Sequence, residues 1–330
     1  MESLKFIPLG GAGEVGRSSY LVEWGESMVL DSGLDMDDGR LPIFDRIRSD
    51  VKAIAISHPH GDHVGSLPIL WSRVRATIVS TEATKVLSLL MLKRIYRKYG
   101  DYLSTIREME DSWVAIDDNS SLELDGDIAI ELHDAAHTFG SSQILVDLGG
   151  YRLLYTGDLY TGESIFGSFH GWDDLNIDDV ILEGTDITQN DMFDSEMSRM
   201  ISDLAGKTDE KFLSLIPVNS LGHGPEVMYF ISKAVEDGVI GTENLYSIGA
   251  INRVIGILHE KGMYKDVTET IMRNFEMLED YRDALDVAKN TRPAILVSTP
   301  GKPLGGFSGN LISAINGDEK AVVVLVEHKA

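Results

Sequence analysis

From residue 57 to residue 65 the chain reads Ser57-His58-Pro59-His60-Gly61-Asp62-His63-Val64-Gly65. Three imidazoles and a carboxylate fall within six positions, directly behind the mainly apolar run Val51–Ile56, which predicts a buried strand. Pro59 biases His58 toward extended backbone. In an extended segment alternate side chains point to one side, here those of His58, His60 and Asp62. Gly61 then permits a sharp turn that sends His63 in another direction, so the stretch can serve two adjacent metal ions.

This density of ligands favours a metal site over a polar loop in which histidines happen to cluster. Only nine histidines occur in 330 residues, so three of them behind one strand are hard to obtain by chance. Imidazole nitrogen and carboxylate oxygen are the ligands expected for zinc, and also for manganese or iron. The chain has no cysteine to compete for this role or to form a disulfide. Because no signal peptide and no membrane-spanning apolar run are recognisable, we expect a cytoplasmic protein without membrane contact.

The run from His58 to His63 resembles the HxHxDH signature of the metallo-β-lactamase superfamily. Within the superfamily, the chain is similar over nearly its whole length to the β-CASP branch, which includes the RNase J enzymes and the mRNA 3′-end-processing endonuclease. Four further segments match in the expected order: Leu9–Leu21, Asp31-Ser32-Gly33, Ala136-His137-Thr138-Phe139-Gly140-Ser141-Ser142 and Tyr155-Thr156-Gly157-Asp158.

The resemblance implies an α/β fold with two domains. A metallo-β-lactamase αββα sandwich would occupy residues 1–184, and an inserted parallel α/β domain of the β-CASP type would occupy residues 185–330. Alternating strand and helix patterns in the second half agree with a parallel sheet. The expected elements there are the helices 195–205, 225–236, 252–261 and 276–289 and the strands 212–217, 245–248 and 294–298.

The resemblance also implies how the metal ligands divide. Two ions about 3.5 to 4 Å apart repel each other, so a shared carboxylate is needed to neutralise and space them. The implied division is one Zn²⁺ or Mn²⁺ ion held by His58, His60 and His137, a second held by Asp62 and His63, and Asp158 shared by both.

Two predicted hairpins lead to the more distant ligands. Residues 121–132 and 142–155 read as strand pairs joined by glycine turns, so that His137 and Asp158 each follow a strand end. His133 is the rival to His137 because it lies only four residues earlier. Gly140 follows His137 as in the family pattern, which favours His137 and leaves His133 as a structural histidine.

Asp31 follows the predicted strand Ser27–Leu30. An aspartate at a strand end is most often a turn cap, and we expect this one to orient the metal loop rather than to bind metal. Nearby, Gly11–Gly16 fits the GxGxxG pattern of a dinucleotide loop. A strand, and not the required helix, is predicted to follow it, which disfavours a dinucleotide site.

Glu183 ends a further predicted strand, 179–183, and matches the first acidic motif of the β-CASP domain. The resemblance therefore assigns catalysis to Asp62 and Glu183. The family continues as Glu-Ser-Thr-Tyr-Gly, whereas this chain has Glu183-Gly184-Thr185-Asp186-Ile187. A solvated acid at a strand end is the alternative for Glu183.

Two segments of the second half resemble phosphate-contacting motifs. Pro217–Glu226 is similar to a Gly-Arg-x-x-Glu segment, but His223 replaces the arginine, and a mostly neutral imidazole would clamp phosphate less firmly. Ser298–Gly306 resembles a Ser-Ser-Gly-Met-Leu-x-Gly-Gly turn. Glycines let backbone amides approach a phosphate, and an ordinary glycine-rich loop is the alternative. The expected substrate contacts are Ser298, Gly305 and Gly306, with Lys302 as a further contact.

The end of the sequence departs from the family pattern. Family members continue beyond the strand predicted at 321–326 and supply two further histidines, one of them a ligand of the second metal. Here His328 is the only histidine beyond His259, and we expect it to be a solvated tail residue. We therefore expect a weak or absent second metal ion, and first-domain strands that a homodimer or a partner chain would supply.

The negative charge of the chain opposes nonspecific binding of nucleic acid. Its net charge is −24, from 53 acidic and 29 basic residues. Binding of a polyphosphate would therefore require a local basic patch together with the metal ions. A helix predicted over 82–99, with Thr81 as its N-cap, has a basic end at Lys93, Arg94, Arg97 and Lys98. Interaction with the helix C-terminal dipole, together with solvation, is favoured there over RNA contact.

The leading hypothesis is a metal-dependent phosphodiesterase that cleaves single-stranded RNA through attack of a metal-bound hydroxide. One alternative is a metallohydrolase of the same superfamily that acts on a small ester or thioester. Another is an RNA-binding or regulatory module whose catalysis is degenerate.

Overall fold

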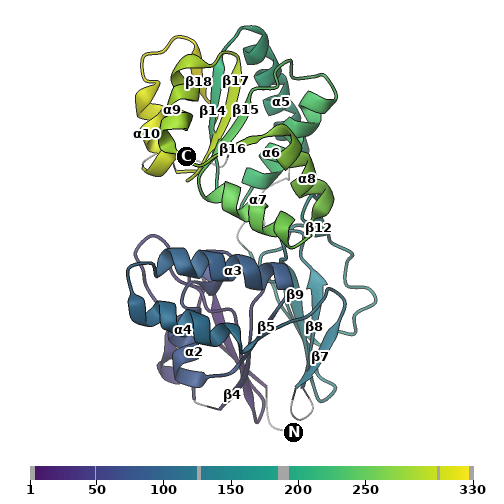
Figure 1. Cartoon of the computed structure of the whole chain (residues 1–330). Helices are drawn as coiled ribbons and strands as arrows, with labels where there is room; N and C mark the ends of the chain where they lie inside the picture. Colours follow the sequence, from purple (N-terminus) through teal and green to yellow (C-terminus); the bar gives the residue numbers. More distant parts are fainter. Residues whose placement is uncertain (1–3, 49, 125–127, 185–192, 303–304, 327–330) are drawn as a thin grey trace. The chain divides into compact units, whose positions relative to one another are not determined.

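The computed structural model describes residues 4–48, 50–124, 128–184, 193–302 and 305–326. The chain divides into two compact units, residues 1–187 and 188–330. Figure 1 draws the first unit in purple to teal and the second in green to yellow. Thr185 to Ile187, where the sequence departs from the family motif, and His328 lie outside the described residues. The assignment of 1–184 and 185–330 to two named domains stays a proposal.

Two larger sheets form the first unit, one mixed and one mainly antiparallel. The first sheet is antiparallel from β1 to β3 and parallel from β3 to β6. The second is antiparallel except for the parallel pair β10 and β13. In spatial order, the first sheet consists of β1 (Lys5–Gly10), β2 (Ser19–Glu23), β3 (Ser27–Leu30), β4 (Val51–Ala55), β5 (Thr77–Ser80) and β6 (Trp113–Ala115), and the second of β13 (Asp179–Ile181), β10 (Arg152–Tyr155), β9 (Ser142–Leu148), β8 (Ile128–Asp134) and β7 (Ser121–Leu124).

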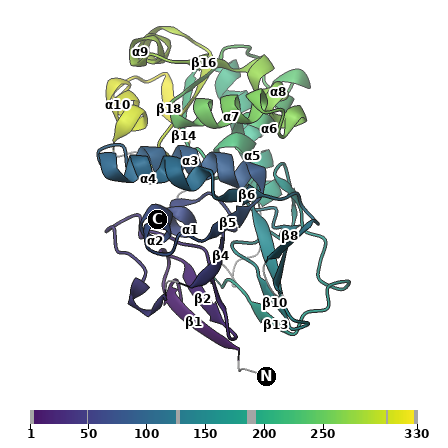
Figure 2. The same cartoon turned by 60° about the horizontal axis from the view of Figure 1, so that its bottom comes forward.

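The alternation of side chains along β4 shows how the layers pack. Ala53 and Ala55 face a core shared with the second sheet, whereas Ile54 faces a core shared with helices. The described part of this unit thus has the layers helix, sheet and sheet, and its α-helices all precede β7 in the chain. Figure 2 shows α3 and α4 side by side over the first sheet. The helices are α1 (Gly61–Val64), α2 (Leu67–Val74), α3 (Glu82–Ile95) and α4 (Gly100–Glu110), with a short ribbon of β11 (Glu163–Ser164) and β12 (Gly167–Ser168) after β10.

A parallel sheet forms the second unit, as the strand and helix alternation predicts. Strands β14 and β17 are buried along their whole length because helices cover both faces of such a sheet. In spatial order the strands are β16 (Glu276–Leu278), β15 (Leu245–Ile248), β17 (Ala294–Ser298), β14 (Leu213–Pro217) and β18 (Ala321–Val323), and the helices are α5 (Phe193–Asp209), α6 (Gly224–Glu236), α7 (Ala250–Glu260), α8 (Lys265–Asn274), α9 (Tyr281–Asn290) and α10 (Gly306–Ala314).

Two predicted helices are wrong in part. The helix expected over 276–289 begins only at Tyr281, because Glu276–Leu278 pairs with β15 as an edge strand and Asp280 caps the helix with its carboxylate. The helix expected over 82–99 ends at Ile95, and a second helix follows from Gly100. The helices α8 and α10 were not predicted.

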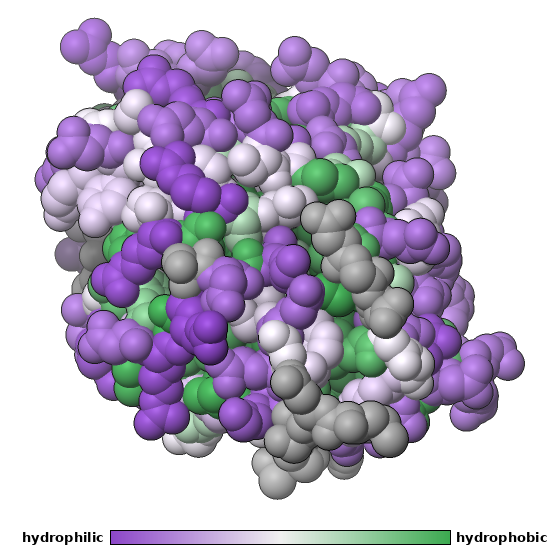
Figure 3. All heavy atoms as spheres, turned by 90° about the horizontal axis from the view of Figure 1, so that it is seen from below, coloured by the Kyte–Doolittle hydropathy of each residue, from purple (hydrophilic) through white to green (hydrophobic). Residues whose placement is uncertain are grey.

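The predicted mixed α/β class is confirmed. Among the described residues, no helix has the combination of length and apolar character required to cross a bilayer. On the face drawn in Figure 3, hydrophilic residues predominate and apolar residues form small separate areas.

Candidate metal centre

The histidine-rich stretch is the connection between β4 and α2. Ile56 continues the strand by donating its N–H to Val79 O at 2.9 Å, and the chain stays extended as far as His60. The one-turn helix α1 then begins at Gly61. The expectation that Asp62 shares the extended alternation of His58 and His60 is therefore wrong, because Asp62 lies on this helical turn.

Four side chains converge at the end of this stretch. His58, His60, His137 and Asp158 each place one nitrogen or oxygen atom within 4.8 Å of the corresponding atoms of the others. His60 Nδ1 lies 3.1 Å from His58 Nε2 and 3.3 Å from His137 Nε2. Asp158 Oδ2 lies 3.7 Å from His58 Nε2 and 3.5 Å from His137 Nε2. The three predicted segments that carry these residues thus meet in space.

The other oxygen of Asp158 faces His63, which in turn lies near Asp62. His63 Nε2 lies 3.2 Å from Asp158 Oδ1 and 4.0 Å from Asp62 Oδ2. One carboxylate therefore has one oxygen toward His58 and His137 and the other toward His63. This arrangement suits a group shared between two neighbouring cation positions.

Asp31 lies behind the cluster and is fully buried. Its Oδ1 accepts the N–H of Ser57 at 2.7 Å, and its Oδ2 accepts the Ser57 hydroxyl at 2.7 Å and faces His63 Nδ1 at 2.8 Å. Ser57 Oγ in turn lies 3.0 Å from His58 Nδ1. Through Ser57 and His63, the Asp31 carboxylate orients the loop from behind.

Tyr155 is a further member of this network; it begins the predicted segment Tyr155–Asp158, but the sequence analysis expected no role for its side chain. It is the last residue of β10, and its hydroxyl donates to Asp31 Oδ2 at 2.7 Å. Its position three residues before Asp158, at the end of a buried strand, is the only sequence signal that could have indicated it.

Burial and neighbouring charges set the protonation of the centre. Burial lowers the pKa of His58 well below its usual value, and the nearby imidazoles of His63 and His60 lower it further. Burial opposes charge on His63 as well, but the carboxylates of Asp158 and Asp31 outweigh it and hold its pKa well above the usual range. Burial likewise opposes charge on Asp158, yet His63 and His58 keep its pKa well below normal. The centre thus has an ionised carboxylate beside a neutral imidazole.

These donors fit a divalent cation. Neutral imidazole nitrogen and ionised carboxylate oxygen are the forms that bind metal. Within the described residues, no lysine or arginine forms an ion pair with Asp158, whose carboxylate lies beside His58, His63 and His137. The pattern therefore supports divalent metal binding at His58, His60, His137 and Asp158.

Glu183 lies beside the loop that carries Asp158. Its Oε1 accepts the N–H of Leu159 at 2.8 Å, and its own N–H donates to Thr156 Oγ1 at 3.2 Å. It is not among the four converging side chains. The contact holds the backbone next to Asp158 in place.

His133 makes its contacts elsewhere. Its Nδ1 lies 3.1 Å from Asn119 Oδ1, and its Nε2 lies 3.0 Å from Glu131 Oε1. The structure thus brings His137, and not His133, to the other histidines.

The predicted substrate contacts of the second unit lie around the end of β17. Ser298 is fully buried, and its hydroxyl is 2.9 Å from that of Ser308, so the expected direct contact of Ser298 with a substrate finds no exposed surface on this residue. Gly305 and Gly306 are exposed and have positive φ. His223 Nδ1 lies 2.7 Å from the buried Glu226 carboxylate.

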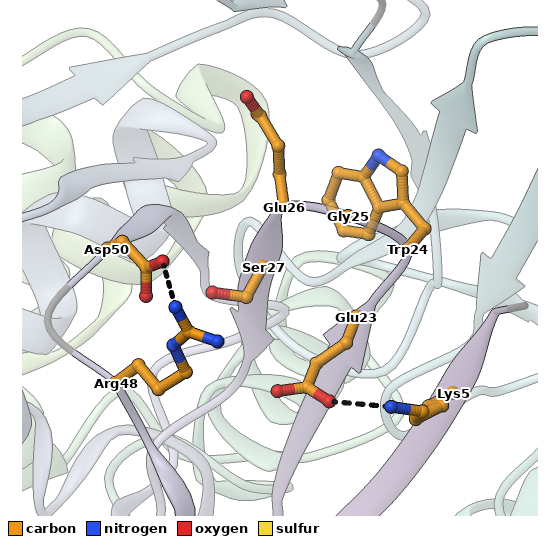
Figure 4. A pocket seen from close by; sticks show the side chains of 8 residues that line it. All are labelled: Lys5, Glu23, Trp24, Gly25, Glu26, Ser27, Arg48 and Asp50. Atoms are coloured by element: carbon orange, nitrogen blue, oxygen red, sulfur yellow. Dashed lines mark ion pairs between the residues drawn. The ribbon is translucent and has the colours of Figure 1, made fainter. Parts of the chain in front are cut away.

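A polar hollow of about 380 Å³ occupies another part of the first unit. Figure 4 shows ion pairs between Arg48 and Asp50 at 3.3 Å and between Lys5 and Glu23 at 4.0 Å in its lining. None of the predicted site residues lines it.

The fold and the cluster define a mixed α/β protein with a histidine- and aspartate-based divalent metal site. The chain belongs to the metallo-β-lactamase superfamily, whose family model matches residues 12–205. Its relatives assign it to the β-CASP branch, as the sequence motifs predict.

Three relatives illustrate the similarity. The chain is 27% identical over 360 residues to endoribonuclease YSH1 of Candida albicans, covering 98% of this chain and 41% of that protein. It is 26% identical over 355 residues to transcription termination factor FttA of Methanocaldococcus jannaschii, covering 98% of this chain and 55% of that protein. An RNase J-like protein of the same archaeon is 24% identical over 324 residues, covering 93% and 73%. The chain spans about half the length of the first two relatives.

A solved structure shares the fold. A protein of unknown function from Enterococcus faecalis matches with a TM-score of 0.58 and 14% identity, over 97% of this chain and 87% of that one.

Proposed function

We propose that the chain is a metal-dependent phosphodiesterase that cleaves single-stranded RNA. The observation that carries this proposal is the convergence of His58, His60, His137 and Asp158, with His63 at the second oxygen of Asp158. The relatives include an endoribonuclease and an RNase J-like protein, which supports RNA as the substrate.

We further propose Zn²⁺ as the native ion, with Mn²⁺ as the alternative, because nitrogen donors outnumber oxygen donors among the four residues. His58, His60, His137 and Asp158 would hold one ion, and Asp62 and His63, sharing Asp158, would hold a second. When bound, such an ion lowers the pKa of water toward neutrality and stabilises negative charge on a phosphoryl group.

The exposure of the side chains gives the centre an inner and an outer side. His58 and His63 are 0% and 5% exposed, whereas Asp62 is 33% exposed and His137 is 29% exposed. Substrate would therefore approach from the side of Asp62 and His137. On that side the Asp62 carboxylate would accept the proton of an attacking water molecule.

Glu183 would act through the Asp158 loop. By accepting the Leu159 N–H, its carboxylate fixes the backbone that presents Asp158. Gly305 and Gly306, which are exposed, would contribute backbone amides to the binding of RNA phosphates, whereas the buried Ser298 would support this turn through its contact with Ser308.

The deciding experiment compares substrates. A labelled single-stranded RNA, a small ester and a thioester are incubated with the protein in Zn²⁺ or Mn²⁺, alongside His60→Ala and Asp158→Ala. The proposal expects RNA cleavage that falls by more than about a hundredfold in both variants, because even residues that only support ligands are worth 10- to 100-fold. Cleavage of esters alone would contradict it in favour of a small-molecule hydrolase. RNA binding without cleavage by the parent protein would contradict it in favour of a binding module.

A further inference from the structure

A dense group of basic residues lies at the end of α3. Residues 93–98 contain four of them, and no six-residue window outside this segment contains more than two. All four side chains are exposed. We call this group the α3 basic patch, and it consists of Lys93, Arg94, Arg97 and Lys98.

The four cations are not used in ion pairs within the described part of the chain, whereas Arg75, on the same unit, pairs with Glu108 at 2.7 Å. Asp101 is the only acid between residues 93 and 102. In a chain of net charge −24, this segment is therefore a local positive field.

The helix dipole explains only half of the patch. Lys93 and Arg94 lie in the last turn of α3, where a cation interacts favourably with the helix C-terminus. The helix ends at Ile95, so Arg97 and Lys98 lie beyond it, in the connection to α4. The interpretation that the sequence favoured, the helix dipole together with solvation, thus leaves solvation alone to account for Arg97 and Lys98.

Three tyrosines lie among these cations. The ring of Tyr96 packs against that of Tyr102 at 4.9 Å, and the ring of Tyr99 lies 6.4 Å and 6.5 Å from these two. Tyr96 is buried, whereas Tyr99 is 60% exposed. The buried ring and its neighbour support Tyr99, which presents an aromatic surface to solvent.

The tyrosine group is joined to the metal-binding loop. The Tyr96 hydroxyl donates to Gly65 O at 2.9 Å, and Gly65 closes helix α1 by donating its N–H to Gly61 O at 2.8 Å. Helix α1 carries Asp62 and His63. The patch is therefore fixed to the same turn that positions part of the candidate metal centre.

We propose that the α3 basic patch and Tyr99 bind the single-stranded RNA substrate beside the cleaved bond, with the four cations on phosphates and the Tyr99 ring stacked on a base. The inference rests on the proposed ribonuclease function and names the surface that overcomes the negative charge of the chain. Cations that follow the backbone and an exposed aromatic ring are the two components that single-stranded nucleic acid sites combine.

The test removes the four charges together. The variant Lys93→Gln, Arg94→Gln, Arg97→Gln, Lys98→Gln is compared with Lys211→Gln, Arg253→Gln, Arg282→Gln, Lys289→Gln. The control residues are also exposed and form no ion pair with a described residue, and both variants change the net charge from −24 to −28. Binding of a nuclease-resistant oligoribonucleotide is followed by fluorescence anisotropy over a range of salt concentrations.

The patch variant should bind at least about tenfold more weakly than the parent, and the slope of log affinity against log salt should fall by roughly 3, at about 0.7 for each single-strand phosphate contact. The control should change affinity by less than about threefold. Equal losses in the two variants would overturn the inference, because they would show an effect of net charge alone.

A second variant tests the stacking. Tyr99→Ala should weaken binding about tenfold, whereas Tyr99→Phe, which keeps the ring, should bind like the parent. Unchanged binding by Tyr99→Ala would overturn the role of the ring.

Hydrolysis of bis(p-nitrophenyl) phosphate separates this inference from the proposed function. That substrate is too small to reach the patch, so both the patch variant and Tyr99→Ala should hydrolyse it at the parent rate. If the parent cleaves RNA and the patch variant keeps the parent KM, the patch inference fails and the ribonuclease proposal stands. If the parent neither binds nor cleaves RNA, both fail.

Discussion

Asp31 holds the candidate metal centre from behind, and its carboxylate connects the loop after β4, helix α1 and strand β10 through Ser57, His63 and Tyr155. Its φ of 58° lies in the left-handed region, which asparagine also tolerates. Asp31→Asn should therefore keep the backbone conformation but lose acceptors for Tyr155 and His63. We expect Zn²⁺ affinity, measured by calorimetry, to fall about 10- to 100-fold. Tyr155→Phe removes only one of these hydrogen bonds and should reduce the Zn²⁺ affinity less. An unaltered Zn²⁺ affinity in Asp31→Asn would contradict the positioning role of Asp31.

His63 should make the metal-free protein less stable at alkaline pH. Its pKa is held well above the usual value because the carboxylates of Asp158 and Asp31 outweigh burial. A raised histidine pKa contributes stability that is complete below the unfolded pKa of about 6.5 and is lost as pH rises through the folded pKa. Because the pKa of His58 is lowered in the folded protein, its effect on stability changes only below the unfolded pKa of about 6.5, where stability falls as pH falls. It therefore does not alter the trend expected above pH 6.5.

Urea unfolding of chelator-treated protein should therefore show a free energy of unfolding that declines above pH 6.5. The decline should be smaller in His63→Gln. A parallel decline in the parent and in the variant would assign it to other groups.

Individual ligand residues could be predicted where their spacing is tight. His58 and His60 follow directly from their density behind a strand, whereas the role expected for Asp158 came from the family resemblance. Tyr155 could not be predicted, because a tyrosine at the end of a buried strand has the same pattern whether it packs in the core or donates a hydrogen bond.

At the scale of single elements, Gly33 places the β3 loop against helix α1. A Cβ at Gly33 would overlap the carbonyl oxygen of Asp62 and lie 2.6 Å from Ser18 N. Both neighbours are backbone, so they cannot rotate away. Gly33→Ala should therefore lower the free energy of unfolding by about 2 to 4 kcal/mol, measured by urea unfolding.

Gly206, on the exposed side of α5, provides the matched control. A Cβ there meets nothing within 4 Å. Gly206→Ala should stabilise the protein by roughly 0.5 to 1 kcal/mol through helix propensity. An unchanged free energy of unfolding in Gly33→Ala would contradict this prediction, because it would show that the loop can move to accommodate the Cβ without loss of stability.

Elements bounded by local signals could be predicted closely. The strands Ser27–Leu30 and Arg152–Tyr155 have the expected bounds, because short apolar runs end at turn residues. The predicted N-cap Thr81 is confirmed, since its hydroxyl accepts the N–H of Thr84 at 3.2 Å. Helix ends and β16 could not be predicted, because pairing with β15 is a tertiary contact that local sequence does not encode.

At the scale of the whole molecule, net charge and proposed substrate are in conflict. A chain of net charge −24 should bind RNA weakly unless positive groups are concentrated near the metal centre. The parallel sheet of the second unit followed from the alternation of elements alone, whereas the position of a basic surface beside helix α1 required the contact between Tyr96 and Gly65.

The measurement that tests the central claim most directly is metal add-back during RNA cleavage. Chelator-treated protein is titrated with Zn²⁺ or Mn²⁺ in the presence of a labelled single-stranded RNA, with Asp158→Asn in parallel. We expect no cleavage without metal, cleavage that rises and saturates as metal is restored, and a loss of more than about a hundredfold in the variant. Cleavage that persists in chelator, or that proceeds at the parent rate in Asp158→Asn, would contradict the account.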